Sequence, residues 1–297
     1  MKEVVIEMSN EEKSFQKTNI NWFPGHMAKT RRDITSIMST LDIIIEVIDS
    51  RIPLSSRIPD LDKLTNGKKK IIVFNKYDLC DKDETNKWIN KYKSEGNVVV
   101  TCDSKNSNDY KKIIDEVKTI MTSVNSKRKE KGLLPKKAKC MVIGVPNVGK
   151  STLINKLVGK NVLGVGNKPG VTKMINTIRI NDFMDLVDTP GILWPKFNSQ
   201  TLALNLASMT VIKEEIISSD IIAIHILKML DKYYKDLLKN NFGIDYYNDD
   251  EVEELFTLIS KFKNIPVKDE VDYDRVSLLI INTIKQEKIK RITFDRM

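Results

Sequence analysis

Gly144-Val145-Pro146-Asn147-Val148-Gly149-Lys150-Ser151-Thr152 stands near the middle of the chain and has the pattern of a phosphate-binding loop. The apolar run 140–143 before it predicts a buried strand, and residues 151–157 after it predict a helix with one apolar face. Glycines let the backbone curl so that successive N–H groups point at phosphate oxygens, and the helix N-terminus adds positive charge. Lys150 would supply a charge to the β- and γ-phosphates and Ser151 a hydroxyl to Mg²⁺. A chance glycine-rich turn is the alternative, but strand, loop and helix in this order favour the phosphate site.

The charge of the chain is unevenly distributed. The first 196 residues hold 35 Lys and Arg against 23 Asp and Glu, whereas residues 197–297 hold 14 against 17. The excess in the half with the phosphate loop is larger than one nucleotide needs, so a polyanionic partner such as RNA is one explanation. Solubility in a lysine-rich proteome explains it equally well.

Cysteine usage and hydropathy indicate the compartment. Cys80, Cys102 and Cys140 are widely spaced and form no CxxC pair, which predicts reduced thiols in a cytoplasmic protein. No run of about 18 apolar residues occurs, so we expect no membrane span. Residues 1–17 mix acids and bases and lack the core of a signal peptide.

Hydrophobic patterning divides the chain into three parts. Residues 1–18 are polar and predict a flexible extension, and residues 19–196 alternate strands with helices. This alternation predicts an α/β domain with a mostly parallel sheet covered by helices on both faces. Residues 197–297 show helical patterns only, which predicts a small all-α domain. The expected strands are 41–48, 71–74, 97–101, 140–143, 174–180 and 183–187, and the expected helices include 84–92, 110–124, 202–212, 216–238, 252–262 and 276–289.

Residues 127–139 hold seven basic residues and one acid, with Gly132 and Pro135 among them. We interpret this segment as an exposed connection between the helix and the strand before the phosphate loop. Basic stretches of this kind contact phosphates without recognising sequence, although each alone is more often a solvated surface.

Asn75-Lys76-Tyr77-Asp78 follows an apolar strand and adds the base to the predicted site. Guanine presents two adjacent donors, N1–H and the 2-amino group, and the two oxygens of the Asp78 carboxylate match them. Alone, this tetrapeptide could be a polar turn. In a chain with a phosphate loop it indicates a guanine nucleotide.

Two further segments fit the metal and switch side of such a site. Asp188-Thr189-Pro190-Gly191 would hold Mg²⁺ through water at Asp188 and contact the γ-phosphate with the Gly191 amide. Thr172 fits a switch threonine that closes over Mg²⁺. Ser104-Lys105 fits the turn that backs the guanine, although it departs from the usual Ser-Ala-Lys form.

These motifs resemble those of the translation-factor-like GTPases in a permuted order, with the guanine motif before the phosphate loop. A circular permutation preserves the contacts of a fold whose original termini lie close together. Here it also leads the chain from the Asp188 motif directly into the helical part. Loss of the γ-phosphate could therefore move that part.

The permuted order and the segments 22–29 (Trp-Phe-Pro-Gly-His-Met-Ala-Lys), 49–53 (Asp-Ser-Arg-Ile-Pro) and 188–195 together resemble the YlqF/RbgA group of bacterial GTPases. The resemblance runs from about residue 19 to the C-terminus and is looser in the helical half. There, Met209-Thr210 stands where relatives have Thr-Gly. The resemblance implies a circularly permuted phosphate-loop GTPase that binds the large ribosomal subunit precursor and its rRNA. It would assist late assembly and hydrolyse GTP to GDP as a release switch. The predicted GTP-binding residues are Asn75, Lys76, Asp78, Ser104, Lys105, Asn147, Val148, Gly149, Lys150, Ser151, Thr152, Thr172 and Gly191.

The resemblance also bears on catalysis and on cations. Ile192 stands where many GTPases carry a water-orienting glutamine, and the family points to His26 as the catalytic residue in its place. An imidazole can hold a water near neutral pH, although His26 could instead have a structural role in its turn. Mg²⁺ is expected at Ser151, Thr172 and, through water, Asp188. In similar permuted GTPases an asparagine at Asn147 accompanies dependence on K⁺, so we expect a K⁺ site there; the alternative is a loop asparagine chosen for its backbone.

Three functions remain open from the sequence. The first is the GTPase release switch, with GTP and GDP as ligands and a monomeric state off the ribosome. The second is a GTP-gated RNA-binding assembly protein with incidental hydrolysis. The third is a signalling or transport GTPase without an RNA partner.

Overall fold

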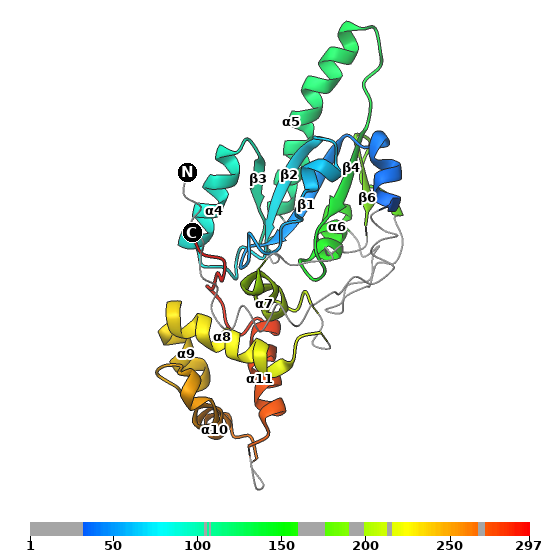
Figure 1. Ribbon diagram of the computed structural model, residues 1–297. Helices are drawn as coiled ribbons and strands as arrows, with labels where there is room; N and C mark the ends of the chain where they lie inside the picture. The colour runs from blue at the N-terminus through cyan, green and yellow to red at the C-terminus, as the bar shows by residue number, and fades with distance from the viewer. Residues whose placement is uncertain are drawn as a thin grey trace, which may run out of the picture.

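The computed structural model describes residues 32–103, 106, 108–159, 176–189, 199–212, 216–266 and 271–297. Within these ranges six strands form one sheet in the order β3-β2-β1-β4-β6-β5 (Figure 1). The sheet is parallel except for β5, which pairs antiparallel with β6 at the edge. The strands are β1 (Ile43–Asp49), β2 (Lys69–Asn75), β3 (Val98–Thr101), β4 (Ala138–Ile143), β5 (Asn176–Arg179) and β6 (Met184–Asp188).

Helices cover both faces of the sheet, which confirms the predicted α/β class. Alternate residues of β1 point to opposite faces. Ile43, Ile45 and Val47 pack in the cluster that contains α5 and α6, whereas Ile44 and Ile48 pack on the other face against the remaining helices. The sheet-covering helices are η1 (Met38–Thr40), α3 (Leu61–Leu64), α4 (Lys82–Ser94), α5 (Asp109–Glu130) and α6 (Lys150–Val158), together with the helical residues 32–37.

Glu46 interrupts the apolar pattern of β1 and yet is fully buried. Its carboxylate accepts a hydrogen bond from the Ile58 amide at 3.0 Å and forms an ion pair with Arg57 at 2.8 Å. A buried carboxylate is tolerated when it is paired in this way. The charge at position 46 therefore does not end the strand.

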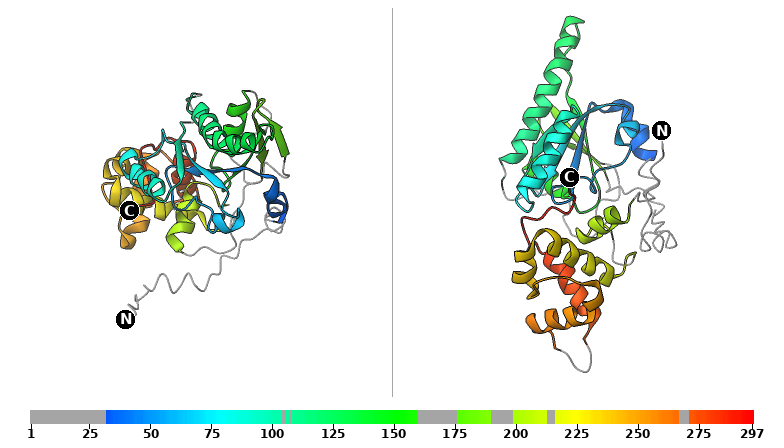
Figure 2. Two further views of the ribbon diagram at one scale, coloured as in Figure 1. Left: turned by 90° about the horizontal axis from the view of Figure 1, so that it is seen from above. Right: turned by 60° about the vertical axis from the view of Figure 1, so that its left-hand side comes forward.

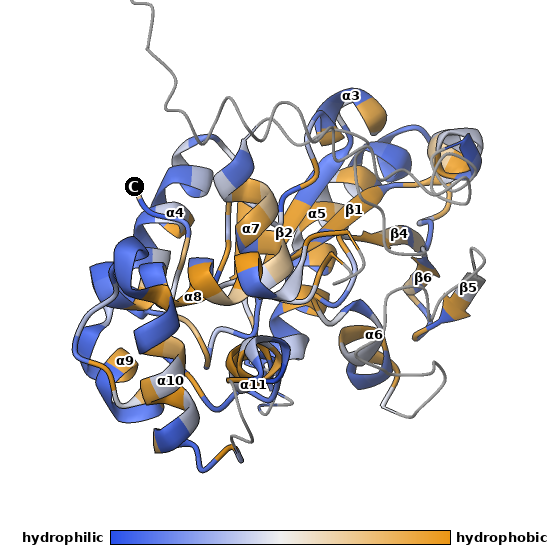
Figure 3. Ribbon diagram, turned by 60° about the horizontal axis from the view of Figure 1, so that its bottom comes forward, coloured by the Kyte–Doolittle hydropathy of each residue, from blue (hydrophilic) through white to orange (hydrophobic). Residues whose placement is uncertain are grey.

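The described residues after β6 contain helices but no strands. They are α7 (Gln200–Ser208), α8 (Ser219–Tyr233), α9 (Lys235–Phe242), η2 (Asp249–Glu251), α10 (Val252–Phe262) and α11 (Tyr273–Lys285). The expected helix over 216–238 is two helices, because the chain breaks at Tyr234, whose hydroxyl binds Asp81 and residue 293. The helices lie beyond the carboxyl ends of the strands (Figure 2). Apolar residues are concentrated in the strands and on the inner sides of these helices (Figure 3), and one buried cluster joins the two parts. The predicted division at residue 197 stays a prediction.

Part of the segment 127–139 is the exposed connection that its charge predicts, but its first four residues belong to helix α5. Helix α5 continues to Glu130, Gly132 follows at φ +68°, and β4 begins at Ala138. Lysine and arginine are good helix formers and stabilise a helix C-terminus electrostatically, which explains the longer helix. We call residues 127–137 the basic arm. It projects past the sheet, away from the C-terminal helices (Figures 1 and 2).

Two further properties concern the length of the helices and the state of the cysteines. Among the described helices, none combines the length and the apolar character needed to cross a bilayer. Cys80, Cys102 and Cys140 are buried free thiols, and burial raises the pKa of Cys80 to about 11.

Candidate functional site

The phosphate loop occupies the turn between β4 and α6, and its glycines are required by close contacts. Gly149 has φ +96°, and a Cβ atom there would lie 2.3 Å from Asn75 Nδ2. At Gly144 a Cβ atom would lie 2.4 Å from the Val47 carbonyl oxygen. Asn147 also adopts a positive φ, +61°, a conformation that asparagine tolerates better than most residues. The path of the backbone in this loop therefore explains why glycine stands at positions 144 and 149.

Lys150, the first residue of α6, turns its side chain back over this loop. Its Nζ donates to the carbonyl oxygens of Gly144 at 3.1 Å and Val145 at 2.9 Å. Burial lowers the pKa of Lys150 to about 8, against the opposing effect of the Asp188 carboxylate. An anion bound beside Nζ would favour the charged form and raise that pKa again.

The predicted guanine turn touches the phosphate loop directly. Asn75 Nδ2 donates to the Val148 carbonyl at 2.7 Å, and Lys76 Nζ donates to the Asn147 carbonyl at 2.9 Å. The two segments meet because β2 and β4 both flank β1, so their carboxyl ends lie at one edge of the sheet. Residues 75–78 and 144–152, which are some 70 positions apart in the sequence, therefore form one site.

Asp78 lies half-buried in the turn after β2. The Leu79 amide donates to the Lys76 carbonyl at 3.0 Å and closes the turn around it. The carboxylate is close enough to the Arg51 guanidinium to help raise the pKa of Arg51, although burial opposes this. Asp78 thus lies in the same turn as Asn75 and Lys76, next to the phosphate loop.

Asp49, which is absent from the predicted site residues, holds Lys76 in place. The buried Asp49 carboxylate binds Lys76 Nζ at 3.0 Å, and its two oxygens accept from Arg51 Nε at 2.9 Å and Nη2 at 2.8 Å. Burial alone would raise the pKa of Asp49, but Arg51 and Lys76 hold it well below its usual range. The sequence signal for this role is an acidic residue at the end of the apolar strand β1.

Ser151 and Asp188 are the described members of the predicted Mg²⁺ set. Asp188 ends β6 and is paired in register with Val142 of β4, and it is fully buried. Ser151 lies in the first turn of α6. A hydroxyl and a buried carboxylate are the hard oxygen ligands that Mg²⁺ prefers, so these residues fit the ion.

Several predicted residues cannot be placed. His26, Ser104, Lys105, Thr172 and Gly191 lie outside the described residues. Their roles stay predictions. Thr152, which follows Ser151 in α6, is half-buried beside the loop.

The phosphate loop also contacts the helical part of the chain. Asn147 Nδ2 donates to the Thr210 carbonyl at 2.5 Å. Thr210 has φ +59°, an uncommon conformation for a β-branched residue. Glycine would adopt this positive φ without strain, whereas threonine does not. The turn after α7 is therefore strained where it accepts a hydrogen bond from the loop.

Known proteins share both the sequence and the fold. A family model described as "50S ribosome-binding GTPase" matches residues 139–264. Ribosome biogenesis GTPase A of Bacillus cereus is 37% identical over 277 residues, which cover 93% of each chain. The GDP-bound structure of TM YlqF superposes with a TM-score of 0.64 at 26% identity, covering 89% of this chain and 99% of that one. The GNP-bound YlqF from T. maritima gives 0.63 at 25% identity, with coverage of 90% and 98%.

Proposed function

The chain belongs to the ribosome biogenesis GTPase A family, and from this membership we propose that it binds a precursor of the large ribosomal subunit and assists its late assembly. Hydrolysis of GTP to GDP would act as the release switch. The observation that carries the proposal is the junction of the guanine turn with the phosphate loop, through Asn75 to Val148 and Lys76 to Asn147. A GTPase of this family would bind base and triphosphate there.

In this proposal Asp78 selects guanine, and Asn75 and Lys76 tie the base side to the phosphate side. Asp49 supports the selection indirectly, because it holds the Lys76 ammonium at 3.0 Å. The main-chain N–H groups of residues 147–152 and Lys150 would bind the phosphates. Ser104-Lys105 would back the base, and Gly191 would contact the γ-phosphate.

Ser151, Thr172 and, through water, Asp188 would hold Mg²⁺, which would supply positive charge to stabilise the phosphates during hydrolysis. K⁺ is proposed at Asn147. Because Nδ2 of Asn147 is turned to Thr210, its side-chain oxygen is the atom suited to a cation. The chain's own contribution is to position these oxygens and to keep Lys150 beside the phosphates.

His26 is proposed to orient the attacking water. Position 192, directly after the Asp188 motif, is isoleucine, and an apolar side chain cannot take that role. The sequence thus leaves the imidazole of His26 as the candidate that the family resemblance supports.

The contact between Asn147 and Thr210 supports the release switch. It joins the phosphate loop to the turn that follows α7, so a shift of the loop would be felt by the helical part. A positive-φ threonine costs about 1–3 kcal/mol of strain, which a small rearrangement could relieve. Such a turn suits an element with two conformations.

The basic arm supports an rRNA contact. Lys127, Lys129 and Lys131 are exposed on it, and Leu134 within it is 83% exposed. Lysines on a projecting element can reach phosphates that a flat surface cannot. The acidic segment 245–254 in the helical part would face away from the RNA. Away from the ribosome we propose a monomer in the cytoplasm.

The test is sucrose-gradient sedimentation of cell extract with the protein bound to a non-hydrolysable GTP analogue or to GDP. We expect salt-sensitive co-sedimentation with large-subunit particles in the analogue and release with GDP. The variant His26→Ala should bind GTP, lose stimulated hydrolysis and remain on precursors. Equal sedimentation in both nucleotide states would contradict the switch.

A second candidate is a GTP-gated RNA-binding assembly protein with incidental hydrolysis, and Ile192 favours it because it implies slow intrinsic turnover. Under that hypothesis His26→Ala would leave precursor release unchanged.

A further inference from the structure

The chain ends in a segment whose burial is not explained by secondary structure. After α11, residues 291–297 run back past the helical part and end beside α4 (Figure 1). Residues 292–295 form neither helix nor strand, yet all four are buried, with Asp295 only 5% exposed. We call residues 291–295 the C-terminal tail.

The tail binds the residues that directly follow Asp78. The Leu79 carbonyl accepts hydrogen bonds from the amides of Arg291 at 2.7 Å and Ile292 at 3.2 Å. The Asp81 amide donates to Thr293 Oγ1 at 3.1 Å, and Thr293 Oγ1 lies 2.8 Å from Thr85 Oγ1. The turn cannot shift without breaking these bonds.

The tail also fixes the loop that follows β1. The Asp295 carboxylate accepts from the amides of Leu54 and Ser55, each at 2.7 Å, and from Ser55 Oγ at 2.5 Å. The Phe294 amide donates to the Arg51 carbonyl at 2.8 Å. Arg51 binds Asp49 with its guanidinium, and Asp49 in turn binds Lys76 Nζ. The tail therefore constrains the guanine turn from a second side.

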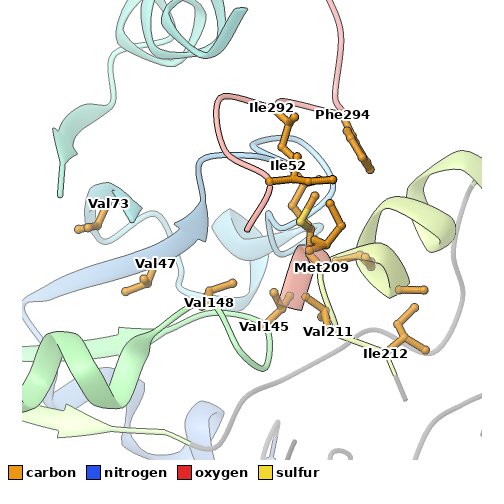
Figure 4. Close-up of a cluster of buried hydrophobic side chains, with 14 of the residues drawn as sticks. Val47, Ile52, Val73, Val145, Val148, Met209, Val211, Ile212, Ile292 and Phe294 are labelled. Carbon is orange, nitrogen blue, oxygen red and sulfur yellow. The ribbon is translucent and has the colours of Figure 1, made fainter. Parts of the chain in front are cut away.

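A third set of contacts connects the tail to the helices. Asn205 of α7 donates from Nδ2 to Asp295 at 2.9 Å, and its oxygen lies 2.8 Å from His225 Nε2 of α8. Burial lowers the pKa of His225 to about 4, so the ring is neutral and Nε2 is the donor. In the apolar cluster of Figure 4, Ile292 and Phe294 gather with Ile52, with Val145 of the phosphate loop and with Met209.

We propose that the C-terminal tail is a positioning element for Asp78, and that it sets how strongly the site prefers guanine. This inference rests on the proposed role of Asp78 in base recognition. The tail itself would not contact the nucleotide. It acts through the Leu79 carbonyl and the loop 49–55.

The experiment compares GDP with IDP in the full-length protein. Inosine lacks the 2-amino group, so the affinity ratio of GDP to IDP reports how well the Asp78 carboxylate receives that group. A hydrogen bond to a charged group of this kind is worth about tenfold or more in affinity. Competition against a fluorescent GDP analogue gives both dissociation constants on one protein preparation.

Asp295→Asn and Thr293→Val are the two test variants. The first places an amide opposite the donors Leu54 and Ser55, and the second removes the hydroxyl that Asp81 binds. We expect each to reduce the GDP-over-IDP ratio by about three- to tenfold. Thr293→Ser keeps the hydroxyl and should retain the parent ratio.

Two controls separate the possible failures. Ile280→Val trims a fully buried side chain of α11 and should lower stability without changing the ratio, because a merely structural loss affects GDP and IDP alike. Asp78→Ala should abolish the preference. If Asp78→Ala keeps it, the assignment of the base site is wrong and the inference falls with it. If Asp78→Ala abolishes the preference but the tail variants keep the parent ratio, the tail does not position Asp78. The assignment of Asp78 to the base site is then unaffected.

Discussion

The phosphate loop and the C-terminal tail lie in one apolar cluster but are specified in different ways (Figure 4). The loop is determined locally, since Gly144 and Gly149 are required by their own backbone surroundings. The tail has no regular structure, and Asp295 is held by residues at positions 54, 55 and 205. The phosphate loop thus follows from a short sequence motif, whereas the position of the C-terminal tail depends on the completed fold.

The largest effect on nucleotide affinity should come from a substitution in the phosphate loop. Gly149→Ala would place a methyl group 2.3 Å from Asn75 Nδ2 in a residue held at φ +96°. We expect nucleotide affinity to fall on the order of 100-fold, since strain and clash together exceed about 2.7 kcal/mol. Equilibrium binding of a fluorescent GDP analogue measures this.

The matched control is Gly159→Ala. Gly159 also has a positive φ, +76°, but a Cβ atom there would meet nothing within 4 Å. We expect a loss of about 1 kcal/mol of stability and no change in affinity. Equal losses of affinity in both variants would show that strain alone, and not the approach of Asn75, makes Gly149 necessary.

The second prediction concerns the C-terminal tail, which is held by residues distant in the sequence. Asp295→Asn should lower the free energy of unfolding by about 2 kcal/mol, because its amide NH₂ would face buried donors to which a carboxylate oxygen now provides an acceptor. Urea denaturation measures the change. Asp274→Asn, at an exposed position in the first turn of α11, should cost only a few tenths of a kcal/mol. Similar values for both would mean that the tail contributes little to stability.

The third prediction uses the pH dependence of Lys150. Its pKa in the free protein is about 8, and bound phosphate would raise it. Above pH 8 binding must therefore take up a proton, so affinity should weaken about tenfold between pH 7 and 9. Titration of GDP binding at several pH values tests this.

Lys150→Arg provides the comparison, because a guanidinium keeps its charge over that range. The affinity of Lys150→Arg for GDP should not show the weakening of about tenfold between pH 7 and 9. Any ionisation of the guanine base would affect the parent protein and the variant equally. Parallel curves for the two proteins would contradict the role assigned to Lys150.

The smallest effect is expected from the basic arm, which lies far from both regions. Replacing Lys127, Lys129 and Lys131 by alanine should weaken RNA binding severalfold and lower the salt dependence by up to about 0.9 per lost phosphate contact. GDP affinity and stability should not change. Three exposed lysines of α4, Lys82, Lys91 and Lys93, make a control of equal charge. An equal loss in the control would assign RNA binding to net charge alone.

Much of the fold could be predicted because its signals are local. The phosphate loop and the guanine turn were expected to form one site, and Asn75 and Val148 are joined by a hydrogen bond. Helix α10 has the expected bounds, Val252–Phe262, since its apolar face is unambiguous. The roles of the individual site residues in binding and catalysis stay predictions.

What could not be predicted depends on contacts between distant segments. The break at Tyr234 has neither proline nor glycine to mark it, and it coincides with hydrogen bonds to Asp81 and Thr293. Helix α5 was expected to end early because a run of charges resembles a loop, although its residues favour helix. The Asp295 network has no sequence pattern, because its partners come from three separate elements.

The position of the tail behind both nucleotide motifs has a consequence for biosynthesis. Strands β1 to β3 and the guanine turn are translated first, the phosphate loop follows, and Arg291 to Asp295 are made after both. Domains fold as they emerge, so the nascent protein can build its sheet before the tail leaves the ribosome. If the tail positions Asp78, a newly made molecule acquires its full selectivity for guanine only once residues 291–295 have emerged.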